Sequence, residues 1–593
     1  SDLRTRAEND ILWFKYHDRQ SNDFTANIKV SYSITPAHKL KLSYRKGWSR
    51  GSWFDWRWKN IPDSTQNSSS IDEYINLSFT HTLSPSTFYT FNFGRLKVDY
   101  SRSLRGRTPP EFWHWDSVLV ETPDTSYWKK IYIGTDYGTD TNQDGFIDIG
   151  AQGNWRGDLS YVWTGKLDLT SQVNPKHLIK FGVEVRYNDL LYTDIQYAGS
   201  YYFPGRDSVP GPWPEYGLYR WVFHTYPIIG SAYLQDKIEL EGLIVNVGVR
   251  ADFFTPGETV YEEDYIRRWK AATGMPLEIK RYRMYFSPRL GISHPISERT
   301  VMYFNYGRFN QLPELQYFYR DPWTGTWVGN PNLRPELTTA YEFGFAHQIA
   351  SNIAIDIKSY SKDIADYVGM IKTGTPPVWV WVNRGYGRAR GIEFQIQKRY
   401  SEFTSGNLSY TYQWATGYAS SAFMEYDRSQ AGLPLPIREN RLDWDQRHAI
   451  VLSFNLEAPK GEKPLGILPD RWGANLLWKF GSGFPYTPAG TDIVITENTA
   501  TAPYTSTFDL KVRKEFSLGR FEYSIFADVL NLFDRKNVSR NYGFNTWTGH
   551  PYIYGDVNWA TKVIWSFRTI QYLRDPRMYP PGRQIKLGIK VNW

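Results

Sequence analysis

Apolar and polar residues alternate without interruption over the last ten residues of the chain. Successive side chains of a β-strand point to opposite sides of the sheet, so this pattern predicts a two-faced strand. One face is apolar and consists of Ile585, Leu587, Ile589, Val591 and Trp593. The other face is polar or small and consists of Gln584, Lys586, Gly588, Lys590 and Asn592. Such a strand, ending on an aromatic residue, is typical of the last strand of an outer-membrane β-barrel. An ordinary strand of a β-sandwich is the alternative.

The same alternation recurs along the chain and predicts an all-β protein. It is clear at residues 24–34, 75–80, 243–250 and 353–358. Strict alternation over such lengths is the signal of a strand that is buried on one face. No stretch approaches the roughly 18 consecutive apolar residues of a membrane helix.

Short and long connections alternate between these segments. Short turns are expected at 35–38, 84–86, 173–176, 296–299, 350–352 and 517–520. Long polar and aromatic connections are expected near 48–72, 101–157, 196–227, 255–281, 309–336, 368–388, 415–446, 483–504 and 535–580. This arrangement is typical of a large transmembrane antiparallel β-barrel with short periplasmic turns and long extracellular loops. We count about 19 strands and, because bacterial barrels usually have an even number, expect a barrel of about 20–22.

The strand pattern also sets the domain boundaries. We expect residues 1–22 to be an N-terminal segment, either an incomplete first strand or a loop, and residues 23–593 to form the barrel.

Composition agrees with a barrel and argues against several other classes of protein. Aromatic residues make up 17% of the 593 residues, as suits aromatic girdles at two membrane interfaces. The net charge of +8 is dispersed, so we expect no nucleic-acid binding. The chain has no cysteine, which excludes thiolate metal sites and cysteine nucleophiles. No phosphate-binding loop or serine-hydrolase context is present, so we expect no enzyme.

Seven segments, in the expected order, resemble the TonB-dependent outer-membrane receptor and transporter family. They are 231–237 with 246–252, 286–291, 330–336 (Asn-Pro-Asn-Leu-Arg-Pro-Glu) with 341–344, 391–393, 442–448, 483–488 and 529–534. The resemblance covers the barrel part of that family, from about residue 24 to Trp593. It implies location in the outer membrane of a Gram-negative bacterium, contact with its lipid, and import of a bulky nutrient such as a siderophore, oligosaccharide or peptide.

The resemblance also implies a plug domain inside the barrel and a partner that couples transport to energy, TonB. We identify neither a plug nor a TonB-contacting segment in these residues, so both are expected only by resemblance. A surface lipoprotein is a further expected partner. Two alternatives remain: a structural or adhesion barrel whose extracellular loops bind surface partners, and a secreted glycan-binding all-β protein.

A calcium loop is the sharpest local motif. Oxygen-bearing side chains and one backbone carbonyl recur as in the first nine positions of a calcium loop, with Gly145 at the sixth position. The candidate ligands are Asp140, Asn142, Asp144, the carbonyl of Phe146, and Asp148. The twelfth position is Ala151 instead of glutamate, so the bidentate ligand is missing. Ca²⁺ bound here would stiffen an extracellular loop, and a polar surface turn is the alternative.

Aromatic residues of the long loops are the candidate substrate-binding residues. Flat rings can stack on sugars or other planar ligands and bury a large area. The residues are Trp113, Trp115, Trp323, Trp327, Trp379 and Trp381. Packing of one loop against another, or a place in the outer aromatic girdle, is the alternative for each.

Overall fold

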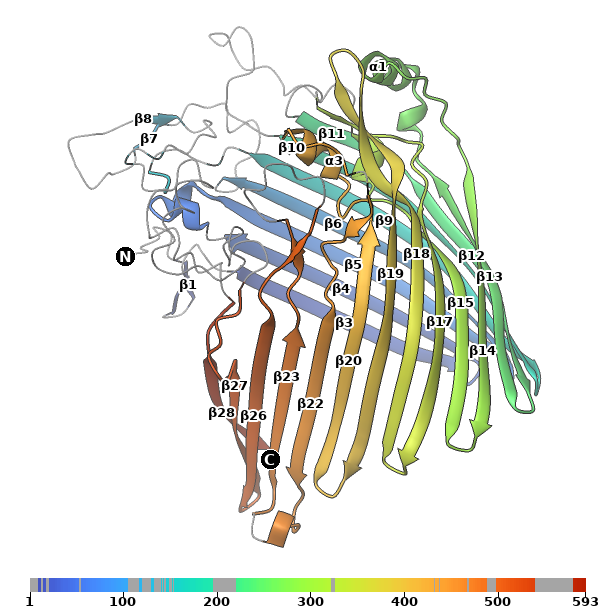
Figure 1. Ribbon diagram of the computed structural model, residues 1–593, viewed down its shortest axis with the longest axis vertical. Helices are drawn as coiled ribbons and strands as arrows, with labels where there is room; N and C mark the ends of the chain where they lie inside the picture. Colours follow the sequence, from blue (N-terminus) through green and yellow to red (C-terminus); the bar gives the residue numbers. More distant parts are fainter. Residues whose placement is uncertain are drawn as a thin grey trace.

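The computed structural model describes most of the chain as one large antiparallel sheet (Figure 1). It describes residues 9–11, 14–16, 21–52, 55–104, 117–119, 130–132, 140, 142, 146–148, 152, 154–195, 220–320, 326–430, 432–436, 438–466, 469–487, 497–538 and 580–592. The predicted all-β class is confirmed.

Nineteen long strands form the wall of the barrel. They are β3 (Ser21–Thr35), β4 (His38–Ser52), β5 (Gln66–Ser84), β6 (Thr87–Leu104), β9 (Trp155–Asn174), β10 (His177–Ile195), β12 (Ile228–Leu240), β13 (Leu243–Thr255), β14 (Arg283–Ser297), β15 (Thr300–Gln311), β17 (Glu336–Ala350), β18 (Ile353–Thr373), β19 (Val378–Ser401), β20 (Thr404–Gly417), β22 (His448–Ala458), β23 (Trp472–Gly481), β26 (Thr505–Leu518), β27 (Phe521–Leu530) and β28 (Gln584–Asn592). The order follows the sequence and returns from β28 to β3.

Shorter elements complete the described part of the chain. Three short strands extend the barrel order: β11 (Arg220–Thr225), β16 (Trp327–Val328) and β21 (Asn440–Arg441). Three separate two-stranded sheets are formed by β1 (Asn9–Ile11) with β2 (Phe14–Tyr16), β7 (Ser117–Leu119) with β8 (Lys130–Tyr132), and β24 (Pro485–Tyr486) with β25 (Ala500–Thr501). The helices are α1 (Glu263–Thr273), α2 (Gln316–Tyr319), α3 (Met424–Gln430), η1 (Trp56–Trp58), η2 (Pro62–Ser64), η4 (Thr259–Tyr261) and η6 (Pro464–Gly466). Within the described ranges, no helix combines the length and apolarity needed to cross a membrane.

Short turns join the strands at one end of the wall and long connections join them at the other. In Figure 1 the short turns lie at the lower end, and α1 and α3 lie at the upper end. All six predicted short turns are confirmed, as between β3 and β4 and between β26 and β27, where Gly519 has φ of +61°. One of the predicted long connections is wrong: most of 368–388 is a tall hairpin, because β18 continues to Thr373 and β19 begins at Val378.

A hydrophobic core lies at the long-loop end. It gathers buried side chains from α1, α2, the upper ends of β18 and β19, and the segments between them. We call this set the loop cluster: Phe254, Val260, Tyr265, Trp269, Leu277, Phe318, Tyr319, Val328, Leu333, Val368, Met370, Val378, Trp379, Val380 and Trp381.

Helix α1 shows how the sequence builds this cluster. Tyr265, Trp269 and Thr273 recur every four residues and form its buried face. Gly274, with φ of +69°, ends the helix by donating its N–H to the carbonyl of Lys270. The indole N–H of Trp269 reaches the carbonyl of Gly329 at 2.9 Å, which ties the helix to the segment before β17.

Candidate functional site

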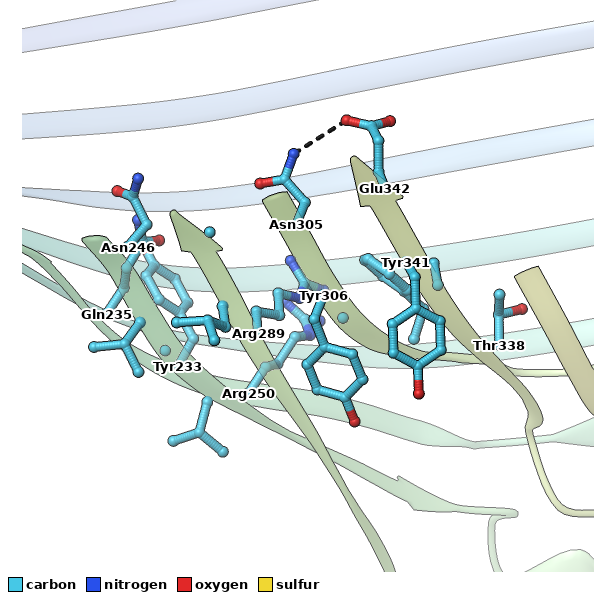
Figure 2. A pocket seen from close by; sticks show the side chains of 18 of the residues that line it. Tyr233, Gln235, Asn246, Arg250, Arg289, Asn305, Tyr306, Thr338, Tyr341 and Glu342 are labelled. Carbon is cyan, nitrogen blue, oxygen red and sulfur yellow. Dashed lines mark hydrogen bonds between the residues drawn. The ribbon is translucent and has the colours of Figure 1, made fainter. Parts of the chain in front are cut away.

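The inner face of the wall is polar. In Figure 2, Asn305 and Glu342 point to one side of the sheet and Tyr306 and Tyr341 to the other, as alternation requires. The amide of Asn305 donates to Glu342 at 3.1 Å. Lys358 binds Glu393 at 3.0 Å and lies 3.5 Å from Glu342. The polar side chains therefore form a hydrogen-bonded and ion-paired layer that runs across neighbouring strands.

A cavity of about 1120 Å³ follows the wall from β10 to β18 (Figure 2). Of the described residues that line it, Glu342 is the one carboxylate, and four are cations: Lys180, Arg250, Arg289 and Lys362. Arg250 is compensated by Asp252 at 2.7 Å, and the Arg289 guanidinium lies 4.7 Å from the centre of the Phe309 ring. The lining therefore has an excess of positive charge.

Tyrosine–glycine pairs hold this wall together. The ring of Tyr303 lies over Gly344 of the neighbouring strand, so closely that a Cβ added to this glycine would fall 2.5 Å from the tyrosine. The Tyr303 hydroxyl then donates to Asp356 of the next strand at 2.9 Å. The same three-strand arrangement occurs for Tyr233, Gly182 and Asp168 and for Tyr360, Gly391 and Gln413. These pairs position the polar groups of the inner face.

Three of the predicted substrate-binding tryptophans come together in and around the loop cluster. Trp327 pairs with Trp379 in a short parallel ladder, and the Trp381 ring stacks 5.1 Å from that of Tyr317. Trp379 and Trp381 are buried, and Trp327 is partly buried beside them. Their faces are covered by other loop residues, so a ligand could stack on them only after the loops open. Their role in binding stays a prediction; Trp113, Trp115 and Trp323 lie outside the described residues.

Arg320 is a buried cation that the sequence pattern did not reveal. Its guanidinium lies 3.2 Å from the centre of the Trp221 ring and 4.2 Å from that of Trp327. Burial lowers the pKa of Arg320 to about 9. Within the described part of the chain, no carboxylate lies within ion-pair distance of it; the aromatic faces and the more distant Asp194 carboxylate favour its charged form.

The segment 330–336, quoted above for its resemblance, fastens the loop cluster to the wall. The side chain of Asn330 donates to the carbonyl of Trp381 at 2.9 Å, and buried Arg283 donates to the carbonyl of Leu333 at 2.5 Å. Arg334 binds Asp366 of β18 at 2.6 Å. Because these contacts reach three different strands, the segment acts as a clamp.

Two of the predicted calcium ligands, Asp148 and Phe146, lie beside the connection between β4 and β5. Asp148 accepts a hydrogen bond from Asn60 at 2.9 Å, and Phe146 is fully buried under the Lys59 ammonium. Asp140 and Asn142 are described, whereas Asp144 lies outside the described residues. Among the residues that the structure describes, no three acidic or histidine side chains form a metal-binding group. Calcium binding therefore stays a prediction.

Comparison with known proteins supports the resemblance to the TonB-dependent receptor family. A family model described as "TonB dependent receptor-like, beta-barrel" matches residues 47–532. No curated protein matches the chain. Solved structures with the same fold include the copper transporter OprC (TM-score 0.55, 13% identity, covering 96% of this chain and 71% of that one). Another is the outer-membrane transporter YddB from Escherichia coli (0.58, 12%, 87% and 66%). A third is the ferric yersiniabactin uptake receptor FyuA from Yersinia pestis (0.54, 11%, 96% and 70%).

The chain thus spans about two thirds to seven tenths of the length of these structures. The family match covers most of the chain and agrees with the two-faced wall, the short turns and the long loops. In outer-membrane barrels of this kind the long loops are extracellular and the outward face of the wall is apolar. The chain therefore belongs to the TonB-dependent receptor-like β-barrel family of the Gram-negative outer membrane.

Proposed function

We propose that the chain forms the barrel of a TonB-dependent transporter that imports a bulky nutrient with a net negative charge. Membership of the family supports the import function. The charge of the cavity indicates the class of substrate. Its described lining has one carboxylate, Glu342, and four cations: Lys180, Arg250, Arg289 and Lys362. A wall of one predominant sign concentrates ligands of the opposite sign and speeds their entry.

The structural neighbours do not bear on the charge of the substrate. They are named as transporters or receptors of copper, of iron and of ferric yersiniabactin. The proposed pathway starts at the extracellular loops and continues along the cationic wall. TonB, a plug and a surface lipoprotein are proposed partners, and Ca²⁺ near Asp140 and Asp148 is a proposed stiffener of one loop.

Uptake by whole cells tests the proposal. Cells that express the full-length gene are incubated with labelled ferric siderophores, oligosaccharides, cobalamin and peptides, with and without a protonophore. We expect accumulation of one anionic ligand that stops when the protonophore is added, while surface binding persists. Replacing Arg250 and Arg289 by glutamine lowers the uptake rate severalfold. The matched control, Arg45→Gln, removes an ion-paired cation far from the cavity, on β4.

An adhesion barrel predicts different results. Its ligand would bind at the surface with or without the protonophore and would not accumulate inside the cell. Accumulation that continues after the protonophore is added would contradict the proposed pathway. So would uptake of the anionic ligand at the wild-type rate by the variant in which Arg250 and Arg289 are both replaced by glutamine.

A further inference from the structure

The outer face of β19 carries a row of arginines on the extracellular side of its apolar residues, which we call the apolar belt. Toward the extracellular end, exposed side chains alternate with buried small ones at 385, 387, 389 and 391. The exposed positions are Ile392, Arg390, Arg388, Tyr386 and Arg384.

The register of the sheet places these arginines on the lipid side. Ile392 lies opposite Ser359, which lies opposite Phe343, and both apolar side chains belong to the outward face. Arg390 and Arg388 are two and four residues farther along the same face, so Arg388 lies about 13 Å from Ile392 along the strand. This distance carries Arg388 from the apolar outward residues toward the extracellular end of the strand, the end at which a bilayer has its outer headgroups.

A groove of about 360 Å³ opens in the outer wall at this height. Tyr386, Arg388 and Arg390 line it from β19, and side chains of β17 and β18, including Leu337 and Ala365, line the opposite side.

A bulge in β18 shapes the groove. The register between β18 and β19 shifts after Ile364, and Asp366 has φ of +60°. The bulge is held from inside by two contacts of Asp366: its carboxylate binds Arg334 at 2.6 Å, and its carbonyl accepts from Asn383 at 2.8 Å. The groove is therefore a built feature of the wall.

The two arginines of the groove differ in how closely carboxylates accompany them. Arg388 lies 3.5 Å from Asp363, which also lines the groove, and 3.6 Å from Glu439; both contacts are long and partly exposed, so each contributes little. Among the described residues, no carboxylate lies within ion-pair distance of Arg390.

The outward charges of β5 and β6 differ from these. There Arg95 binds Glu73 at 2.9 Å, and the Tyr44 hydroxyl donates to the same carboxylate. Arg95 and Glu73 are thus closely paired within the protein, whereas Arg390 has no such partner among the described residues and is available to a ligand.

We propose that this groove binds the phosphate-bearing headgroup of an outer-leaflet lipid. Arg388 and Arg390 present planar guanidinium groups that match phosphate oxygens in two-point hydrogen bonds. The acyl chains of the same molecule lie on the apolar belt below, over Ile392 and Phe343. A free phosphate would gain only the first of these contacts, so the occupant is a lipid.

Lipid retention by the full-length protein tests this site. The protein, extracted in detergent, is mixed with a diphosphorylated lipid A, with its dephosphorylated form, or with inorganic phosphate, and bound molecules are counted by native mass spectrometry. We expect the wild type to prefer the diphosphorylated lipid at least tenfold over the dephosphorylated one. Arg388→Gln with Arg390→Gln abolishes this preference, and Arg388→Lys with Arg390→Lys keeps part of it.

Lys362→Gln is the matched control. Lys362 lies opposite Ala389, at the height of the two arginines, but on the lumen side of the wall. This variant keeps the wild-type preference. Heat-dependent migration in gels establishes that each variant is a folded barrel before it is compared.

Three results would overturn the proposal. They are equal retention by the wild type and the double glutamine variant, equal retention of the dephosphorylated lipid, and displacement of the lipid by an equal concentration of inorganic phosphate. The last result would indicate a simple anion site.

Discussion

The barrel wall and the loop cluster place their large apolar side chains in opposite surroundings. In the wall, Phe286 and Leu587 are 59% and 78% exposed. In the loop cluster, Trp269 and Trp381 are 2% and 0% exposed. The wall gathers polar groups on its inner face, in pairs such as Lys358 and Glu393, and presents large apolar side chains such as Phe286 and Leu587 on its outer face. The loop cluster is packed like the core of a water-soluble domain.

This difference implies that the two regions depend on different solvents. The stability of the wall comes from hydrogen bonds between strands and from the match to lipid. The stability of the loop cluster comes from burying apolar area away from water. Damage to one region should therefore leave the other largely intact, and the following predictions test this separation, from the largest expected effect to the smallest.

Trp381→Ala should have the largest effect, and it should be confined to the loop cluster. Removing a fully buried tryptophan leaves a cavity and costs about 3–5 kcal/mol. We expect faster proteolysis of residues 255–281 and 312–333, with an unchanged thermal unfolding transition of the barrel. A shift of the barrel transition by the same amount would mean that the two regions unfold together.

Phe343→Arg should damage the wall and spare the loop cluster. Phe343 lies near the middle of β17 on the outward face, where an arginine facing lipid costs about 2–4 kcal/mol. Folding into lipid vesicles, followed by gel migration, should show the loss. Gln395→Arg places the same residue on the lumen side of β19 and should fold like the wild type; equal losses for both variants would contradict the assignment of faces.

Gly344→Ala should disturb the wall more mildly. The added methyl group would lie 2.5 Å from Tyr303 and displace its ring, and overpacking of this kind costs about 1–3 kcal/mol. Gly165→Ala is the matched control, because no atom lies within 4 Å of the added Cβ there. Denaturant unfolding of both variants measures the difference, and a control that loses as much as Gly344→Ala would show that the tyrosine contact is irrelevant.

The smallest effect should be a dependence of α3 packing on pH. Burial raises the pKa of Glu425, which accepts the N–H of Met370 at 3.1 Å. The packed state therefore binds the proton more tightly than the open state. Its stabilisation is complete below the ordinary carboxyl pKa and is lost as the pH rises through the raised pKa.

Proteolysis measures this dependence. We expect cleavage after Arg428 to become faster as the pH rises from the ordinary carboxyl pKa to well above it, when each rate is divided by that of Glu425→Gln, which cannot ionise. A ratio that does not change with pH would contradict the role given to Glu425.

Alternation of apolar and polar residues predicted the strands of the wall well, because the two faces of a strand can be recognised from that strand's own sequence. Residues 24–34 and 584–593 show two faces by themselves, and the turn at Gly519 needs only its neighbours. The tall hairpin at 368–388 was missed because both of its faces are covered at the loop cluster, so its apolar run Val378–Val382 does not alternate.

The candidate site was less predictable because it depends on contacts between distant segments. The prediction grouped Trp327, Trp379 and Trp381 by residue type, but only the packing of α2 and β16 against β19 shows that their faces are covered. Arg320 has no distinguishing neighbour in the sequence, and its environment is created by Trp221, about one hundred residues earlier in the chain. The clamp at 330–336 was recognised as a motif, but its hydrogen bonds to Trp381 and Asp366 are features of the tertiary structure.

Lipid quenching of single-cysteine variants tests the orientation of the wall most directly, because the chain has no native cysteine. A fluorophore is attached in turn at positions 340, 341, 342 and 343 of β17, and the protein is placed in vesicles of brominated lipid. We expect strong quenching at 341 and 343 and weak quenching at 340 and 342. Equal quenching at all four positions, or quenching of the opposite pair, would contradict a barrel with an apolar outer face and a polar lumen.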